Sequence, residues 1–99
     1  MAKKVNITDK LDFDGNPSLI IRDQEIEVDA SAETVLRVMG GMGEGNVGSP
    51  KFVMDMYELI FPEKSREIIK SFNLQFKDFA KVVEAGISAI VDSDEESGE

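Results

Sequence analysis

The chain has 99 residues and a formal net charge of −9, and it contains neither cysteine nor histidine. Its length suits one domain, and the two missing residue types exclude disulfides, thiolate chemistry and the commonest general base and metal ligand. Net negative charge disfavours binding to DNA, and no apolar run approaches the roughly 20 residues of a membrane span. We therefore expect a soluble intracellular protein without a nucleic-acid or membrane partner.

The first predicted element is a β-hairpin region spanning residues 11–28. Leu11 and Phe13 alternate with aspartates, and the "GNP" at 15–17 is typical of a turn. The segment "SLIIRDQEIEVD" then has apolar residues at every second position on either side of a polar "RDQ" break. This pattern predicts two or three short antiparallel strands whose apolar face rests on helices.

Helices are predicted from residue 31 to residue 91. The first has Asp29 or Ser31 as its N-cap, and the glycines from Gly40 onward end or weaken it. The second begins at Ser49 with proline in the next position, and Pro62 closes it and can open the third.

The fourth predicted helix, about 76–91, is the clearest in the chain. Its apolar residues recur at steps of three or four, at Phe76, Phe79, Val83, Ile87 and Ile90. We expect Gly86 to pack closely against another backbone. The predicted fold class is α+β, mainly α, with one globular domain over residues 1–91 and a disordered acidic tail, "DSDEESGE", at 92–99.

The stretch "MGGMGEGNVGSPK" holds five of the eight glycines and raises the question of a phosphate-binding loop. Gly43, Gly45 and Gly48 match the spacing of a dinucleotide fingerprint, but a helix rather than a strand precedes them and Glu44 adds negative charge. A P-loop would also need a Gly-Lys pair, which is missing. We interpret residues 40–48 as a flexible connection between two helices.

Two other motifs fail on the residues that their chemistry requires. The segment "DFDGNP" resembles the start of a calcium loop, yet its sixth position is Pro17 and its twelfth is Asp23, so a hairpin turn is the better interpretation. Ser93 follows the last helix in an Asp-Ser-Asp context, unlike the phosphopantetheine serine of acyl carrier proteins. The sequence predicts no catalytic residue, cofactor or metal site, and hence no enzyme.

Four of the five methionines flank the glycine-rich connection. They either fill the core or form an adaptable surface for a protein partner, because thioether side chains fit irregular shapes. Helical spacing places Met39 and Met56 in the core and leaves Met42 and Met54 as the more exposed pair. The candidate partner-binding residues are Met39, Met42, Phe52, Met54 and Met56, around a groove expected between the first two helices.

The segment "YELIFPEKSREIIKSFNLQFKDFAKVVEAGISAIV", residues 57–91, resembles the C-terminal part of tail assembly chaperones of long-tailed (siphovirus-type) bacteriophages. These proteins share a helix ending at a Leu-Phe-Pro-like corner, a short helix, an Asn-Leu break and a final apolar helix. The earlier "IEVDASAETVLRVM" is similar to their entry from hairpin to helix. The glycine-rich connection has no counterpart in this resemblance.

The resemblance implies a non-enzymatic role in the host bacterial cytoplasm. Such chaperones coat the tape measure protein during assembly of the tail tube and are absent from the mature virion, and a longer frameshifted form contacts the tail tube protein. Three alternatives stay open: an acidic inhibitor or DNA mimic, a structural tail or connector component, and self-association through the hairpin edge or the last helix.

Overall fold

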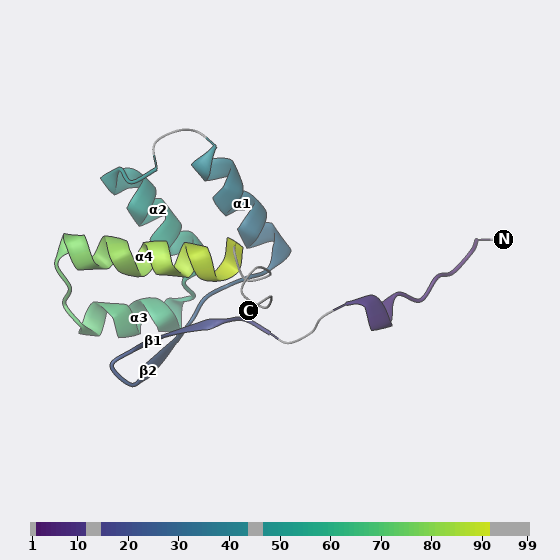
Figure 1. Cartoon of the computed structure of the whole chain (residues 1–99), viewed down its shortest axis with the longest axis horizontal. Coiled ribbons are helices and arrows are strands. Elements are labelled where there is room, and N and C mark those ends of the chain that lie inside the picture. The colour runs from purple at the N-terminus through teal and green to yellow at the C-terminus, as the bar shows by residue number, and fades with distance from the viewer. Residues whose placement is uncertain (1, 12–14, 44–46, 92–99) are drawn as a thin grey trace.

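A two-stranded hairpin and four α-helices follow one another along the chain (Figure 1). The computed structural model describes residues 2–11, 15–43 and 47–91. The strands are β1 (Ser18–Ile21) and β2 (Gln24–Glu27), and the helices are α1 (Ala32–Met42), α2 (Pro50–Ile60), α3 (Glu63–Ser71) and α4 (Phe76–Val91). This arrangement confirms the predicted α+β, mainly helical fold, whereas the predicted tail at 92–99 lies outside the described residues.

The strands pair antiparallel, with Leu19 opposite Ile26 and Ile21 opposite Gln24. The turn between them consists of Arg22 and Asp23, whose φ angles of 56° and 83° are those of a type I′ turn. This turn lies at the polar "RDQ" break predicted between the two strands, whereas a turn was also expected at "DFDGNP", of which residues 12–14 lie outside the described residues.

Residues 15–17 lead into β1 instead of connecting two strands. The side chain of Asn16 donates to Glu27 Oε2 at 2.7 Å and accepts from the Ala30 N–H at 3.0 Å, which holds the start of β1 against the end of β2. Leu11, predicted to lie in a strand, is outside both strands and half exposed, and Phe13 lies outside the described residues.

Local capping determines where the helices begin. The hydroxyls of Ser31 and Ser49 accept from the Thr34 and Phe52 N–H groups, so they are the N-caps of α1 and α2. Pro62 stands immediately before α3, as predicted. The helix α1 continues through Gly40 and Gly41 and ends at Met42, inside the glycine-rich stretch that was expected to end or weaken it.

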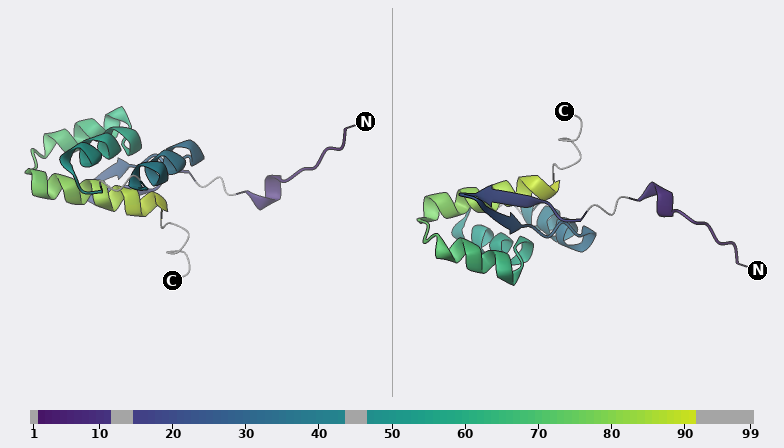
Figure 2. Two further views of the ribbon diagram at one scale, coloured as in Figure 1. Left: turned by 90° about the horizontal axis from the view of Figure 1, so that it is seen from above. Right: turned by 90° about the horizontal axis from the view of Figure 1, so that it is seen from below.

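The hairpin lies on one side of the helices, while the first residues of the chain extend away from the body (Figure 2). Two polar contacts fix the hairpin to the corner between α2 and α3, and a third holds the corner itself. Ser65 Oγ donates to the Glu27 carbonyl at 2.7 Å, and the Asp29 N–H donates to the Ile60 carbonyl at 2.8 Å. The Arg66 guanidinium in turn donates to the Phe61 carbonyl at 2.6 Å. The corner and the hairpin are thus joined through their backbones.

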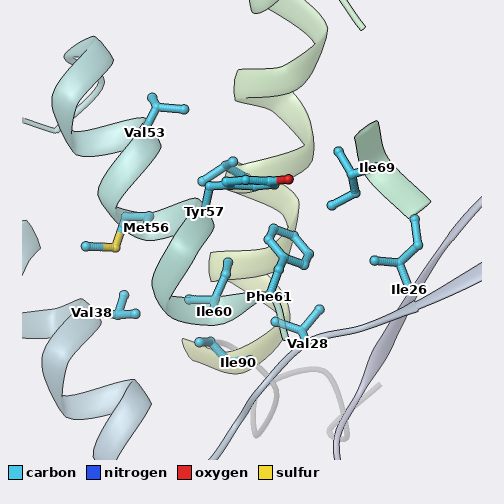
Figure 3. Close-up of a cluster of buried hydrophobic side chains, with 11 residues drawn as sticks. Ile26, Val28, Val38, Val53, Met56, Tyr57, Ile60, Phe61, Ile69 and Ile90 are labelled. Carbon is cyan, nitrogen blue, oxygen red and sulfur yellow. The ribbon is translucent and has the colours of Figure 1, made fainter. Parts of the chain in front are cut away.

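The core lies where the hairpin, α2 and α4 meet (Figure 3). Phe61 is almost fully buried at its centre, and Tyr57 packs against both Phe61 and Phe79, with ring centroids 5.9 and 4.8 Å apart. The remaining buried apolar residues are Ile26, Val28, Val38, Val53, Met56, Ile60, Ile69, Val83 and Ile90.

Two predictions about α4 need correction. A Cβ on Gly86 would lie 2.8 Å from Ile60 Cδ1 and 2.9 Å from Phe61 Cζ, so this glycine makes room for side chains of the α2–α3 corner and not for another backbone. Phe76 is 55% exposed, because it is the first residue of α4 and lies one turn before Phe79, where packing against Tyr57 begins.

Candidate functional site

An apolar cavity of about 330 Å³ lies between α2 and α4. Its volume is at the lower end of the roughly 300–1,000 Å³ that is usual for ligand pockets. Met42 at the end of α1 and Val47 before α2 line it and are themselves exposed, so they form its rim and the cavity opens at the surface. We call this feature the α2–α4 groove; its other lining residues are Gly48, Phe52, Val53, Ala80, Val83, Glu84, Ile87 and Ser88.

The α2 side of the groove depends on how that helix begins. Ser49 accepts from the Phe52 N–H at 3.1 Å, and proline at the next position supplies a φ angle that suits a first helical residue. Phe52 and Val53 therefore occupy the first turn of α2 and face the groove. Lys51, between this cap and Phe52, is exposed and pairs with Asp55 at 2.8 Å.

The α4 side is a continuous helical stripe at steps of three and four residues. It contains Ala80, Val83, Glu84, Ile87 and Ser88. Ala80 and Ser88 are small, so this side of the groove leaves space that larger residues would fill. Val83, in contrast, is buried and connects the groove to the core.

The five predicted partner-binding residues do not form one surface. Met42 and Phe52 line the groove. Met39 and Met54 are about half exposed but do not line it. Met56 is only 5% exposed, so it belongs to the core and is not accessible to a partner.

Met39 and the predicted position of the groove also need correction. Helical spacing placed Met39 in the core, but Val38 takes the buried position beside it. The groove was expected between α1 and α2, but these helices pack directly: a Cβ on Gly41 would lie 2.9 Å from Met56 Cε. The absence of a side chain at Gly41 thus brings α1 and α2 together, and the hollow lies between α2 and α4, with Met42 at the end of α1 on its rim.

Sequence reasoning missed Val47 and the whole α4 side of the groove. The α4 stripe was visible as spacing, but Ile87 was interpreted only as part of an apolar face. The small residues Ala80 and Ser88, eight positions apart on the same face, carried a further signal, since a helix that packs tightly along its full length needs bulk there.

The lining of the groove is largely apolar. Glu84 is its one ionisable lining residue among those described. Within the described ranges, no group of three or more acidic side chains could hold a metal ion. A second hollow of about 180 Å³ is polar and lies between the hairpin and α3, where Glu25, Glu27 and Lys64 line it. The arrangement at the α2–α4 groove suits apolar contact with a protein side chain.

Asp29 and Tyr57 have shifted pKa values, and both shifts have structural causes. The Ser31 N–H donates to Asp29 at 2.9 Å, and together with the Thr34 hydroxyl at 2.8 Å it holds the pKa of Asp29 below the ordinary 3.8, against the opposing effect of partial burial. Burial raises the pKa of Tyr57 above its ordinary 10.0, and the nearby Arg66 opposes that rise. Neither group lines the α2–α4 groove.

None of the helices in the described part of the chain has the length and apolar character needed to cross a membrane. Comparisons with protein-family models, with curated proteins and with solved structures found no match.

Proposed function

We propose that this protein is a non-enzymatic tail assembly chaperone of a long-tailed bacteriophage. In this proposal it binds the tape measure protein in the host cytoplasm and assists assembly of the tail tube. The observation that carries the proposal is the α2–α4 groove, an apolar hollow rimmed by a methionine on an otherwise acidic protein. The resemblance of residues 57–91 to that family supplies the identity of the client.

The dimensions and lining of the groove suit one part of a helical client. A hollow of about 330 Å³ between two helices accommodates apolar side chains that a client helix presents at steps of three or four residues. Met42 and Phe52 provide adaptable and aromatic contacts at the open side. Such a site would accept many apolar segments of a long protein and require no particular sequence.

The net charge of −9 supports the same role. Several copies bound along one apolar client would present like charges to solvent and to one another, which keeps a coated complex soluble. The tail tube protein is the second proposed partner, through the longer form that the family resemblance implies.

Binding to fragments of the cognate tape measure protein tests the proposal. Val47→Glu and Ala80→Glu should each weaken binding at least about tenfold, because a carboxylate would be buried near Glu84. Leu36→Glu is the matched control: it changes charge equally on an exposed site of α1 outside the groove and should leave the affinity unchanged. Circular dichroism verifies the fold of each variant.

Two measurements distinguish the proposal from its alternatives. Apolar client binding should persist in about 0.5 M salt, whereas an acidic inhibitor or DNA mimic would lose affinity steeply as its charges are screened. A chaperone should also be missing from mature particles by mass spectrometry, whereas a connector component would be present in stoichiometric amounts. Failure of every tape measure fragment to bind would contradict the proposal.

A further inference from the structure

The outer edge of β1 has hydrogen-bonding groups without partners. Two residues form the turn, so Ile21 and Gln24 are a hydrogen-bonded pair, and such pairs alternate along the ladder. The bond from the Val28 N–H to the Pro17 carbonyl at 2.9 Å fits this alternation. The backbone N–H and C=O groups of Ser18 and Ile20 therefore point away from β2, and no described residue bonds to them.

This edge also lacks the usual protection against pairing with another chain. Natural edge strands are commonly guarded by charged side chains, proline or a bulge. Here both edge residues are uncharged, and Ile20 is 73% exposed, more than any other large hydrophobic residue in the described ranges. The opposite edge differs, because the Glu27 carbonyl accepts a hydrogen bond from Ser65.

The N-terminal arm, residues 2–11, is the second unpartnered feature. Its residues are all exposed, and in the described part of the chain its hydrogen bonds join only residues of the arm itself. It extends away from the body (Figures 1 and 2), and the molecule is correspondingly elongated, 58 × 34 × 29 Å. Val5 and Ile7 alternate with Lys4 and Asn6, which is the pattern of a strand with one apolar face.

The arm and the hairpin carry opposite charges. Three lysines against Asp9 give the arm a net charge of +2. In the hairpin, residues 18–27, three acids against Arg22 give −2. Glu25 and Glu27 lie opposite Ile20 and Ser18 on the same face, one strand further in than an added strand would pair, so only long basic side chains of that strand would extend toward them.

We propose that the N-terminal arm of one copy adds as a third strand to the β1 edge of a second copy. Residues 3–7 form the strand, which is one residue longer than the four residues of β1. Val5 and Ile7 cover the exposed Ile20, and Lys3, on the same face, lies near Glu25 and Glu27. The backbone of the arm satisfies the free groups of Ser18 and Ile20.

The arm pairs with the β1 edge of a second copy because it is directed away from β1 of its own chain. Asn16 fixes the chain at the entrance to β1 through its bonds to Glu27 and Ala30, and the described arm residues lie far from the edge (Figure 1). This self-association does not depend on the proposed function, and it uses a surface distinct from the α2–α4 groove.

Crosslinking between two single-cysteine chains tests the pairing, since the protein has no cysteine of its own. Val5→Cys and Ile20→Cys chains carrying different tags are mixed and treated with a short bis-maleimide. A Val5–Ile20 crosslink between the two chains is expected in clear excess over the same experiment with Leu36→Cys, whose position on α1 is exposed to a similar degree. Equal yields for the two pairs would overturn the proposal.

A second measurement uses the mass of the protein in solution. The unmodified chain should associate in light scattering, and Ile20→Pro should raise the dissociation constant at least about tenfold by removing one outward N–H and the apolar contact. Ile20→Thr retains the N–H and should have an intermediate effect. A chain that stays monomeric at high concentration would contradict the pairing.

Discussion

Asp29 connects the hairpin to α1 through a few short hydrogen bonds. Its carboxylate accepts from the Ser31 N–H and the Thr34 hydroxyl, while its own N–H donates to the Ile60 carbonyl. Thr34 is buried, so its hydroxyl needs this acceptor. The sequence offered Asp29 or Ser31 as the N-cap of α1; the structure assigns the cap to Ser31 and gives Asp29 the role of holding the capping residues in place.

Replacement of this carboxylate should lower stability in a pH-dependent way. We expect Asp29→Asn to reduce the free energy of unfolding by about 1 kcal/mol at neutral pH, because a charged acceptor becomes neutral. The folded pKa of Asp29 lies below the 3.8 of the unfolded chain, so its contribution is complete above pH 3.8 and is lost as pH falls through the folded value. Urea denaturation across this range measures the effect.

The free energies of unfolding of Asp29→Asn and of the unmodified protein, plotted against pH, should therefore converge in acid. Glu25→Gln is the control, since it removes an equal charge from an exposed hairpin position and should change stability little. A constant difference between Asp29→Asn and the unmodified protein down to the lowest pH would show that the carboxylate's charge is not responsible.

Among the secondary-structure elements, helix packing depends on the positions of glycines, which have no side chain. The side chains of Ile60 and Phe61 pack against Gly86 in α4, and the side chain of Met56 packs against Gly41 in α1. A Cβ added to Gly40, the neighbour of Gly41 in the same helix, would meet no atom within 4 Å. Two glycines therefore serve helix packing, whereas Gly40 contributes no close contact.

Alanine substitutions should separate these roles. Gly86→Ala should destabilise the protein by about 1–3 kcal/mol, because the new methyl group overlaps Ile60 and Phe61 and this outweighs the gain in helix propensity. Gly40→Ala should stabilise it by up to about 1 kcal/mol, since propensity alone changes. Thermal and urea unfolding of both variants provide the comparison.

A double variant identifies the contact. Ile60→Val removes the Cδ1 atom that lies nearest to Gly86, so the cost of Gly86→Ala should be smaller in that background. If Gly86→Ala stabilised the protein as Gly40→Ala does, the close packing of α4 on the α2–α3 corner would be refuted.

Helix boundaries were largely predictable, because capping is local. Ser49 with Pro50, the Pro62 corner and the break at Asn73, whose φ is 55°, each act within a few residues. The end of α1 was predicted less sharply: the glycines from Gly40 onward were expected to end or weaken the helix, and it ends at Met42, where α1 packs on α2. The break at "RDQ" was predictable from its polar residues, although Arg22 and Asp23 lack the usual Asn-Gly signature, whereas residues 15–17, also expected to form a turn, lead into β1.

In the molecule as a whole, repulsion between the acidic side chains outweighs attraction between opposite charges. The formal net charge is −9. The ion pairs found among the described residues, Arg37–Glu33 and Lys51–Asp55, both lie on exposed helix surfaces one turn apart. Exposed pairs of this kind contribute little to stability. Self-repulsion of the acidic chain therefore outweighs its ion pairs.

Salt should consequently stabilise the fold. We expect the free energy of unfolding by urea to rise by a few tenths to about 1 kcal/mol between ~10 mM and ~300 mM NaCl, because screening weakens the repulsion more than it weakens the two pairs. KCl at equal ionic strength should give the same change, which separates screening from specific ion binding. A fall in stability with salt would mean that attractive pairs dominate.

The sequence by itself determined the order of the elements, most helix boundaries and the acidic, cysteine-free and histidine-free character of the chain, because these depend on composition and on interactions between near neighbours. Helical spacing had placed Met56 in the core and Met54 at the surface, but only the tertiary structure decided that Met39 is exposed and that the groove lies between α2 and α4. The physical reason is that a helical stripe fixes which residues share a face, whereas the approach of neighbouring helices, here controlled by Gly41 and Gly86, decides which face is covered.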